Sequence, residues 1–132
     1  MRPGERSRTA EFVAFTRAVG TLAPQVPGFS DPVAWQFLPA RWQKRVERAR
    51  ARLAAGTRRS PYPIWLRGIA LFNQFRTANL DRAVLGSGPL PQLVILGAGL
   101  DTRAWRMDAL KDTVVSPCQP GLEARARRVG SL

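Results

Sequence analysis

A glycine pair directly after a short aliphatic run is the feature of this sequence most suited to chemistry. Residues 93–96 (Leu-Val-Ile-Leu) are typical of a strand, and Gly97, Ala98 and Gly99 follow at once. Glycines let a backbone turn tightly and let a ligand approach main-chain N–H groups without a Cβ in the way. Because nucleotide-type ligands bind such loops, these three residues form a candidate ligand-binding loop. Taken alone, the pattern also fits an ordinary tight turn after a strand.

Several residue types that support catalysis are missing from the 132-residue chain. It has no histidine, which removes the commonest general base, the commonest metal ligand and every Ser–His or Cys–His nucleophile. Cys118 is the single cysteine, so neither an internal disulfide nor a multi-cysteine zinc site can form within the chain. We therefore expect no metal site, assign no catalytic residue, and interpret Cys118 as an incidental residue rather than a nucleophile.

Positive charge is concentrated in parts of the chain. The 21 basic and 9 acidic residues give a formal net charge of +12, and residues 41–59 contain eight basic residues but one acidic residue. A basic surface raises the affinity for phosphate polymers through counterion release, so a nucleic-acid-binding module is one alternative. We favour a solvated helix face instead, and expect no nucleic-acid partner.

The distribution of charged residues predicts neither a membrane span nor a secretory signal. Arg67 and Arg76 interrupt the longest apolar stretch, so no run reaches the roughly 20 apolar residues that cross a bilayer. The first residues include Arg2, Glu5 and Arg6 instead of an apolar core followed by small residues. We expect a cytoplasmic protein with no membrane partner.

Apolar spacing and turn residues predict helices first and strands afterwards. Helices are expected at residues 8–19, from Asp31 onward, at 40–55 and at 64–85, the last one well buried, with Ser7 and Asp31 as N-caps and Gly20 and Gly56 as ends. Strands are expected at 93–96, buried on both faces, and at 113–115, with a helical turn at 102–107 and an Arg-rich helix at 122–129. The order predicts an α/β fold with a helical cap at residues 1–88 and the start of an α/β domain at 89–132.

A longer string of residues around the glycine loop resembles a known family. Residues 94–107 (VILGAGLDTRAWRM) resemble the cofactor loop of the leucine carboxyl methyltransferase family, a group of S-adenosylmethionine-dependent O-methyltransferases. Residues 76–81 (RTANLD) resemble a segment shortly before that loop in bacterial members, and residues 7–10 resemble their opening. The resemblance covers most of residues 7–115. It implies the first one or two strands of a Rossmann-like class I methyltransferase sheet, truncated after them.

The resemblance also assigns roles in binding S-adenosylmethionine. The backbone of Gly97, Ala98 and Gly99 would lie against the methionine and ribose part of the cofactor, and Asp101 would help to fix the loop. An alternative for Asp101 is that its carboxylate only caps the helical turn at residues 102–105.

Two arginines are the expected partners of the cofactor's methionine carboxylate. Arg76 resembles the family arginine that receives it, and a guanidinium suits this role because its planar fork can hold a carboxylate through two charge-assisted hydrogen bonds. Arg17 resembles a second cation that reaches the same carboxylate. For Arg76, the alternative is an exposed helix charge paired with Asp81.

The sequence departs from the family in two respects. Members carry an acidic residue about 20 positions beyond the glycine loop for the ribose hydroxyls, and Cys118 stands at that position. A thiol is a poor acceptor, and losing a charge-assisted pair would cost about 1.5–3 kcal/mol of binding free energy. Members also continue well beyond the length of this chain, through the strands that complete the sheet.

The function implied by the resemblance is methyl transfer to a carboxylate or hydroxyl oxygen of a small molecule or of a protein C-terminus. A carboxylate acceptor suits a histidine-free chain, because it is ionised at neutral pH and needs no general base. The alternatives are an inactive remnant of such an enzyme and the basic nucleic-acid-binding module. The sequence does not predict the oligomeric state.

Overall fold

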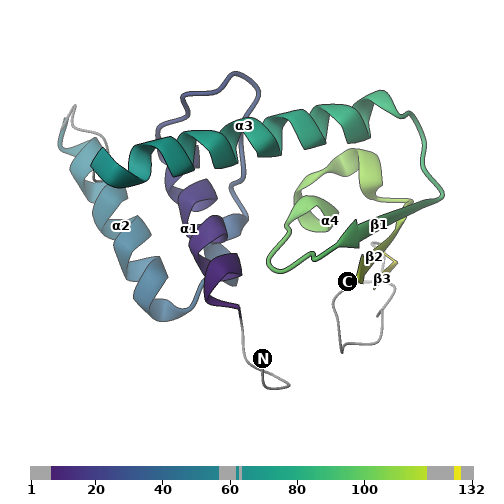
Figure 1. The fold of residues 1–132 in the computed structure, drawn as a ribbon, viewed down its shortest axis with the longest axis horizontal. Helices are drawn as coiled ribbons and strands as arrows, with labels where there is room; N and C mark the ends of the chain where they lie inside the picture. The colour runs from purple at the N-terminus through teal and green to yellow at the C-terminus, as the bar shows by residue number, and fades with distance from the viewer. Residues whose placement is uncertain (1–6, 57–61, 63, 119–126, 129–132) are drawn as a thin grey trace.

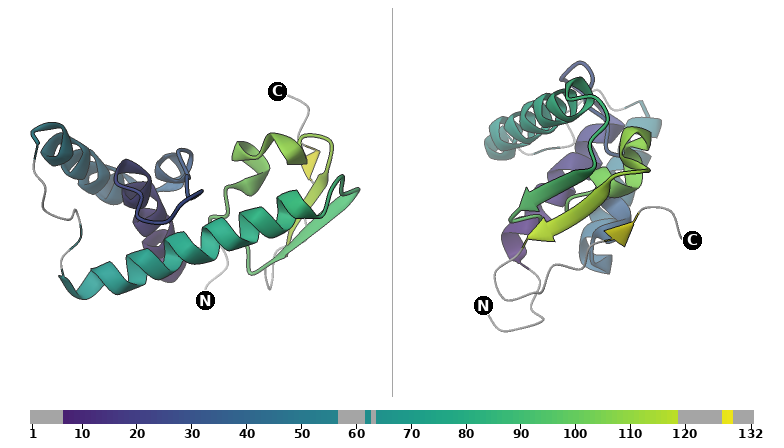
Figure 2. Two further views of the ribbon diagram at one scale, coloured as in Figure 1. Left: turned by 90° about the horizontal axis from the view of Figure 1, so that it is seen from above. Right: turned by 90° about the vertical axis from the view of Figure 1, so that its right-hand side faces the viewer.

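The computed structural model describes residues 7–56, 62, 64–118 and 127–128, which fall into a helical part and an adjoining α/β part (Figure 1). The helical part consists of α1 (Arg8–Leu22), the 3-10 helix η1 (Ala34–Phe37), α2 (Ala40–Ala54) and α3 (Ile64–Gly86). The α/β part consists of β1 (Gln92–Leu96), α4 (Arg103–Arg106), the 3-10 helix η2 (Asp108–Leu110), β2 (Val114–Cys118) and β3 (Arg127–Arg128). Figure 2 shows α3 running along both parts, so that one helix joins α1 and α2 to the strands.

The core of the helical part forms where α1 packs against α2 and α3. Phe15 and Val19 of α1 meet Val46 of α2 and Leu66 of α3 in one buried cluster. Buried polar groups join the same helices, because Asn73 of α3 donates a hydrogen bond of 2.9 Å to the Thr16 hydroxyl. The predicted helices at 8–19, 40–55 and 64–85 are therefore confirmed as elements, with small shifts at their ends.

The predicted helix caps are right at Ser7 and Gly56 and wrong at Gly20. The Ser7 hydroxyl accepts from the Ala10 N–H, and Gly56, at φ +76°, follows the end of α2. The first helix instead continues past Gly20 to Leu22. A Cβ at Gly20 would lie 2.9 Å from the Gln74 side chain, so this glycine permits the close approach of α3 rather than ending α1.

The helix expected from Asp31 onward is only a 3-10 helix of four residues, η1. The N-cap residue is Val33 rather than the predicted Asp31, but the Asp31 carboxylate still accepts from the Ala34 N–H, the first of η1, at 3.1 Å. Pro39 explains why the helix stops, because a proline disfavours helical backbone in the residue before it. Leu38 is accordingly extended, at φ −80° and ψ 144°.

The strands form a small mixed sheet in the order β1-β2-β3. β1 and β2 are parallel, with Gln92 opposite Val114 and Leu96 opposite Cys118, which confirms an α/β arrangement and lengthens the second predicted strand. Residues 127–128 pair antiparallel with β2, so the prediction of a helix there is wrong. The rest of the predicted helix at 122–129 lies outside the described residues.

Burial is the property that the sequence predicted least well. β1 is covered on one face only: Leu93 and Ile95 pack against Ala104, Leu110 and Val115, whereas the side chains of Val94 and Leu96 are exposed. Similarly, α3 buries one face against α1, and its other face exposes large apolar side chains, including Ile64, Trp65, Phe72 and Phe75. The sequence predicted that the strand at 93–96 is buried on both faces and that the helix at 64–85 is well buried. Both predictions assumed neighbouring elements that the described residues do not supply.

Candidate functional site

The glycine loop takes the backbone shape that requires glycine. Gly97 and Gly99 have φ of +62° and +52°, in the left-handed region, and the Asp101 N–H closes the turn by donating to the Ala98 carbonyl at 2.8 Å. A Cβ at Gly99 would lie 3.0 Å from the Ala10 Cβ, so the loop lies directly against the start of α1. A Cβ at Gly97 would meet open space. The backbone at Gly97 is therefore accessible to a ligand, while Gly99 joins the loop to the helical part.

Asp101 caps the short helix α4 that follows the loop. Its carboxylate accepts from the Arg103 backbone N–H at 2.9 Å and pairs with the Arg103 guanidinium. Thr102, at the formal N-cap position, makes no side-chain cap bond. Asp101 therefore links the loop to α4, as the capping interpretation expects.

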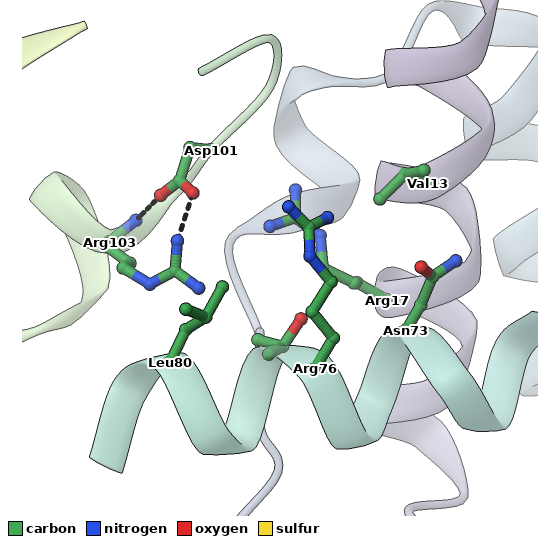
Figure 3. Close-up of a pocket in the computed structure, with 8 residues that line it drawn as sticks. Val13, Arg17, Asn73, Arg76, Leu80, Asp101 and Arg103 are labelled. Atoms are coloured by element: carbon green, nitrogen blue, oxygen red, sulfur yellow. Dashed lines mark hydrogen bonds and ion pairs between the residues drawn. The ribbon is translucent and has the colours of Figure 1, made fainter. Parts of the chain in front are cut away.

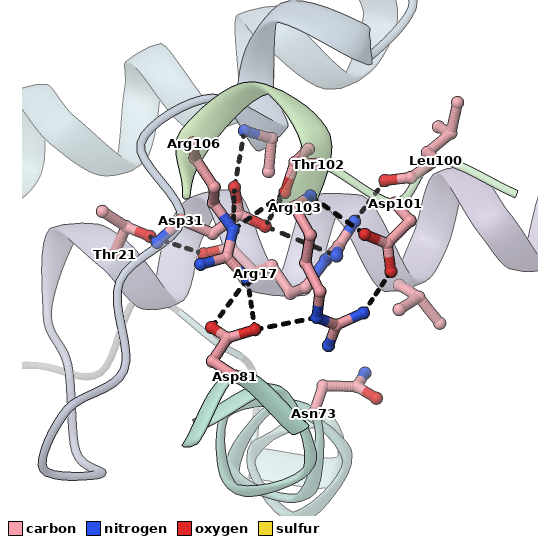
Figure 4. A network of polar contacts seen from close by, with 12 residues as sticks. Arg17, Thr21, Asp31, Asn73, Asp81, Leu100, Asp101, Thr102, Arg103 and Arg106 are labelled. Carbon is pink, nitrogen blue, oxygen red and sulfur yellow. Dashed lines mark hydrogen bonds and ion pairs between the residues drawn. The ribbon is translucent and has the colours of Figure 1, made fainter. Parts of the chain in front are cut away.

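Three arginines and three aspartates meet between α1, α3 and α4 in a largely buried network (Figure 4). They come from distant parts of the sequence, and their formal charges cancel. The members are Arg17, Asp31, Asp81, Asp101, Arg103 and Arg106.

Two aspartates bind the arginines of α4 to the helical part. Asp81 of α3 accepts from Arg103 Nε at 2.8 Å and pairs with Arg106 Nη2 at 2.7 Å. Asp31 accepts a 2.7 Å hydrogen bond from the Thr102 hydroxyl and lies 3.6 Å from Arg106 Nε. Both carboxylates are almost inaccessible to water, so their pairing with arginine is what makes their burial tolerable. The network fixes the segment after the glycine loop relative to α1 and α3.

Arg17 is the member of the network with an unfulfilled hydrogen-bond donor. Its Nη2 donates to the Leu100 carbonyl, and its Nη1 lies 3.4 Å from the Asp31 carboxylate. Its Nε is buried with no hydrogen-bond partner among the described residues. Burial lowers the pKa of Arg17, and the charges of Asp31 and Asp101 oppose that shift. A buried N–H without an acceptor costs about 1–3 kcal/mol, so an acceptor supplied from outside would stabilise this site.

Arg76 does not pair with Asp81, which corrects one of the two interpretations offered for it. Five residues along an α-helix turn a side chain by about 140° from its starting direction, so the two side chains leave α3 on different faces. Asp81 is buried against Arg103 and Arg106. Arg76 is exposed and has no ion pair with any residue that the structure describes.

Arg17 and Arg76 line one small cavity (Figure 3). Its volume is about 40 Å³, and Asp101 is the one acidic residue among the described residues that line it. The lining residues come from α1, α3 and the segment after the glycine loop: Val13, Arg17, Asn73, Arg76, Thr77, Leu80, Asp101 and Arg103. Three of the six residues expected to form the site, Arg17, Arg76 and Asp101, thus meet at one place.

Sequence reasoning missed the roles of Arg103, Arg106 and Asp81. Arg103 and Arg106 belong to the string around the glycine loop, but nothing local indicated that their partners would be Asp31 and Asp81. The i, i+3 spacing of the two arginines on α4 was the available signal, because it places both on one face of a short helix.

Two kinds of feature are absent from the described part of the chain. It contains no group of three or more side chains suited to hold a metal ion. None of its helices is long and apolar enough to cross a membrane.

The fold and the site together define a class of protein. A glycine loop at the carboxyl end of a parallel strand, with basic side chains beside it, is the arrangement with which α/β folds bind nucleotide-type cofactors. The chain belongs to the leucine carboxyl methyltransferase family, whose model matches residues 10–116.

Two relatives agree with this family. A predicted S-adenosyl-L-methionine-dependent methyltransferase of Streptomyces coelicolor is 38% identical over 116 residues, which cover 81% of this chain and 35% of the relative. A protein of the same description from Frankia alni is 43% identical over 106 residues, covering 76% of this chain and 34% of the relative. The chain therefore spans about a third of the length of these curated relatives. No solved structure matches it.

Proposed function

We propose that this chain forms the first part of the S-adenosylmethionine-binding region of an O-methyltransferase. The observation that carries the proposal is the cavity beside the glycine loop, where Arg17 and Arg76 come together. Membership of the leucine carboxyl methyltransferase family and the two relatives described as S-adenosyl-L-methionine-dependent methyltransferases support it.

The charges and hydrogen-bond donors at the cavity fit the carboxylate end of the cofactor. The buried network has a formal charge of zero as a whole, so among the described residues that line the cavity Arg76 is the cation that no carboxylate of the network balances. The unpaired Nε of Arg17 also lacks an acceptor. A carboxylate would offer acceptors to both groups and would balance the charge of Arg76. At about 40 Å³, the cavity suits a small ionic group rather than a nucleoside.

The loop residues have a separate role in this proposal. Gly97 and Ala98 present main-chain groups to the methionine and ribose part, while Gly99 and Asp101 hold the loop on α1 and α4. When bound, S-adenosylmethionine supplies an electrophilic methyl group on its sulfonium. The residues of this chain bind and orient the cofactor.

We further propose that the methyl acceptor is a carboxylate or hydroxyl oxygen of a small molecule or a protein C-terminus. A carboxylate acceptor agrees best with this chain, because it needs no base and the chain has no histidine. A hydroxyl acceptor would require a base from elsewhere in the enzyme.

We also propose that further strands complete a Rossmann-like sheet beside β1, so that the described fold is a truncated form of the enzyme's fold. β1 is an edge strand in the described sheet, and its exposed Val94 and Leu96 are apolar. Parallel sheets are normally covered on both faces. The register places Cys118 beside Leu96, next to the glycine loop, where an acidic residue would bind the ribose. We therefore expect cofactor binding weaker than in a relative with an acid at this position.

The proposal is tested by calorimetric titration of the purified 132-residue chain with S-adenosylmethionine and with 5′-methylthioadenosine, which lacks the amino-acid end. The Arg76→Ala variant should bind S-adenosylmethionine about tenfold to a hundredfold more weakly, because it loses a charge-assisted pair. Its affinity for 5′-methylthioadenosine should not change. The matched control is Arg82→Ala, an exposed arginine of the same helix that does not line the cavity.

Two results would contradict the proposal. If the folded chain shows no saturable binding of S-adenosylmethionine, its own residues do not form a cofactor site, and the remnant interpretation is favoured over the proposal. If Arg76→Ala weakens both ligands equally, Arg76 does not receive the carboxylate.

A further inference from the structure

A second, larger cavity lies on the other side of α1 from the glycine loop. Its volume is about 260 Å³, and Phe12 and Phe15 of α1 line it, whereas Val13 and Arg17 line the small cavity. Figure 1 shows why the two cavities are separate, since α1 stands between α2 and the α/β part. The remaining lining residues are Trp42, Arg45, Arg48, Ala49 and Arg52 of α2 and Trp65 and Leu66 of α3.

One wall of this groove carries a row of arginines on α2. Arg45, Arg48 and Arg52 follow a spacing of three and four, which places them on one helix face over about 10 Å. All three are exposed, and none forms an ion pair with a residue in the described ranges. Glu47, the one acid on α2, does not line the groove. The groove therefore combines an apolar floor with uncompensated positive charge.

The acid nearest to this row on α1 is already paired. Glu11 is buried and accepts from the guanidinium of Arg41 and from the Trp42 indole N–H. It is therefore not free to pair with Arg48 or Arg52, so these two guanidinium groups remain available to a carboxylate of a ligand.

The aromatic rings of the groove decide which kind of ligand fits. The Trp42 ring packs against Phe15, with ring centroids 4.5 Å apart, and the Arg45 guanidinium lies 4.7 Å from its centre. Trp42 is thus engaged by its neighbours and offers little ring surface for stacking. Single-stranded nucleic acids rely on successive free aromatic platforms. Among the described residues of this groove, Trp65 is the one large exposed ring. The volume is also below the roughly 300–1,000 Å³ of pockets for drug-sized ligands.

We propose that this groove binds an acidic, amphipathic peptide segment of a partner protein. One large apolar side chain of the segment fills the cavity beside Trp65 and Leu66, and its carboxylates meet Arg48 and Arg52. Amphipathic segments dock in this way when anchor residues fill a groove and complementary charges flank it. The site is distinct from the cavity beside the glycine loop, because the two share no lining residue among those that the structure describes.

The test is a selection from a library of short random peptides on the purified full chain, followed by fluorescence titration of the enriched peptides. Enriched sequences should combine a large apolar residue with acidic residues within one helical turn of it. The double variant Arg48→Glu/Arg52→Glu should weaken their binding by at least about tenfold. A matched control, Lys44→Glu/Arg50→Glu, changes the same number of charges on exposed α2 residues outside the groove and should have less than about a threefold effect.

A further variant distinguishes peptide binding in the cavity from general attraction between opposite charges. Trp65→Ala removes an exposed ring, so it should leave the circular dichroism spectrum unchanged and still weaken the enriched peptides by about tenfold. The proposal is overturned if no peptide is enriched, if enriched peptides lack acids, or if the control variant weakens binding as much as the groove variant. It is also overturned if a labelled oligothymidylate binds in the groove and no acidic peptide does.

Discussion

The two arginine clusters on either side of α1 differ in burial and in pairing. Toward the glycine loop, Arg17, Arg103 and Arg106 are buried, and three aspartates balance them. Toward α2, Arg48 and Arg52 are exposed and form no ion pair with the residues that the structure describes. The difference follows from desolvation: a buried charge is tolerated only when it is paired and hydrogen-bonded, whereas water stabilises an exposed one. The buried cluster therefore holds the fold together, and the exposed cluster is free to bind a ligand.

The largest effect that this comparison predicts comes from removing Asp81. Asp81→Ala leaves Arg103 and Arg106 buried without their shared acceptor, which should cost about 3–5 kcal/mol in the free energy of unfolding. Urea denaturation followed by circular dichroism measures it, with the exposed Asp108→Ala as control. A loss below about 1 kcal/mol would show that the network contributes little to stability.

A second prediction sharpens the contrast between the two glycines of the loop. Gly97→Ala should lower the free energy of unfolding by about 1–2 kcal/mol, because a residue with a Cβ is strained in the left-handed backbone region. Gly99→Ala adds an overlap with the Ala10 side chain and should cost about 2–4 kcal/mol.

Ala10→Gly provides the check on that overlap. In the Gly99→Ala background it should recover part of the loss, giving a double-mutant coupling of about 1 kcal/mol or more. If the effects of the two substitutions on the free energy of unfolding are additive, residues 10 and 99 do not interact and the loop does not pack against α1.

Burial of a phenolic hydroxyl has a different signature, which Tyr62 reports. Its hydroxyl donates to the Thr16 carbonyl, and burial raises the pKa of Tyr62 above its ordinary value. Because the folded pKa is the higher one, the contribution to stability is present below the unfolded pKa of about 10 and is lost as pH rises through the folded pKa. Tyr62 is the single tyrosine, so tyrosinate absorbance follows it directly. Titration with a midpoint near 10 in the folded chain would contradict its burial.

The comparison also explains what could be predicted from sequence. Local patterns identified most helices, both parallel strands and the glycine loop, because caps, periodicity and turn residues act over a few positions. Local patterns failed where residues far apart in the sequence determine which side chains are buried and which charges are paired. The exposed face of α3 depends on which elements cover Phe72 and Phe75, and the partners of Arg103 lie on other helices. Proximity in sequence suggested Asp81 as the partner of Arg76, and helix geometry separates them.

The smallest effect is expected at the exposed cluster. Arg48→Ala should change the free energy of unfolding by no more than about 0.5 kcal/mol, because the side chain is solvated and has no ion pair with the described residues. Arg106→Ala should cost several times more, because Asp81 and Asp31 then lose a buried partner. Urea denaturation at low and high salt separates the two further, since salt screens exposed charges more than buried ones. If Arg48→Ala were as destabilising as Arg106→Ala, the α2 arginines would belong to the framework of the fold, and a ligand-binding role for them would lose its basis.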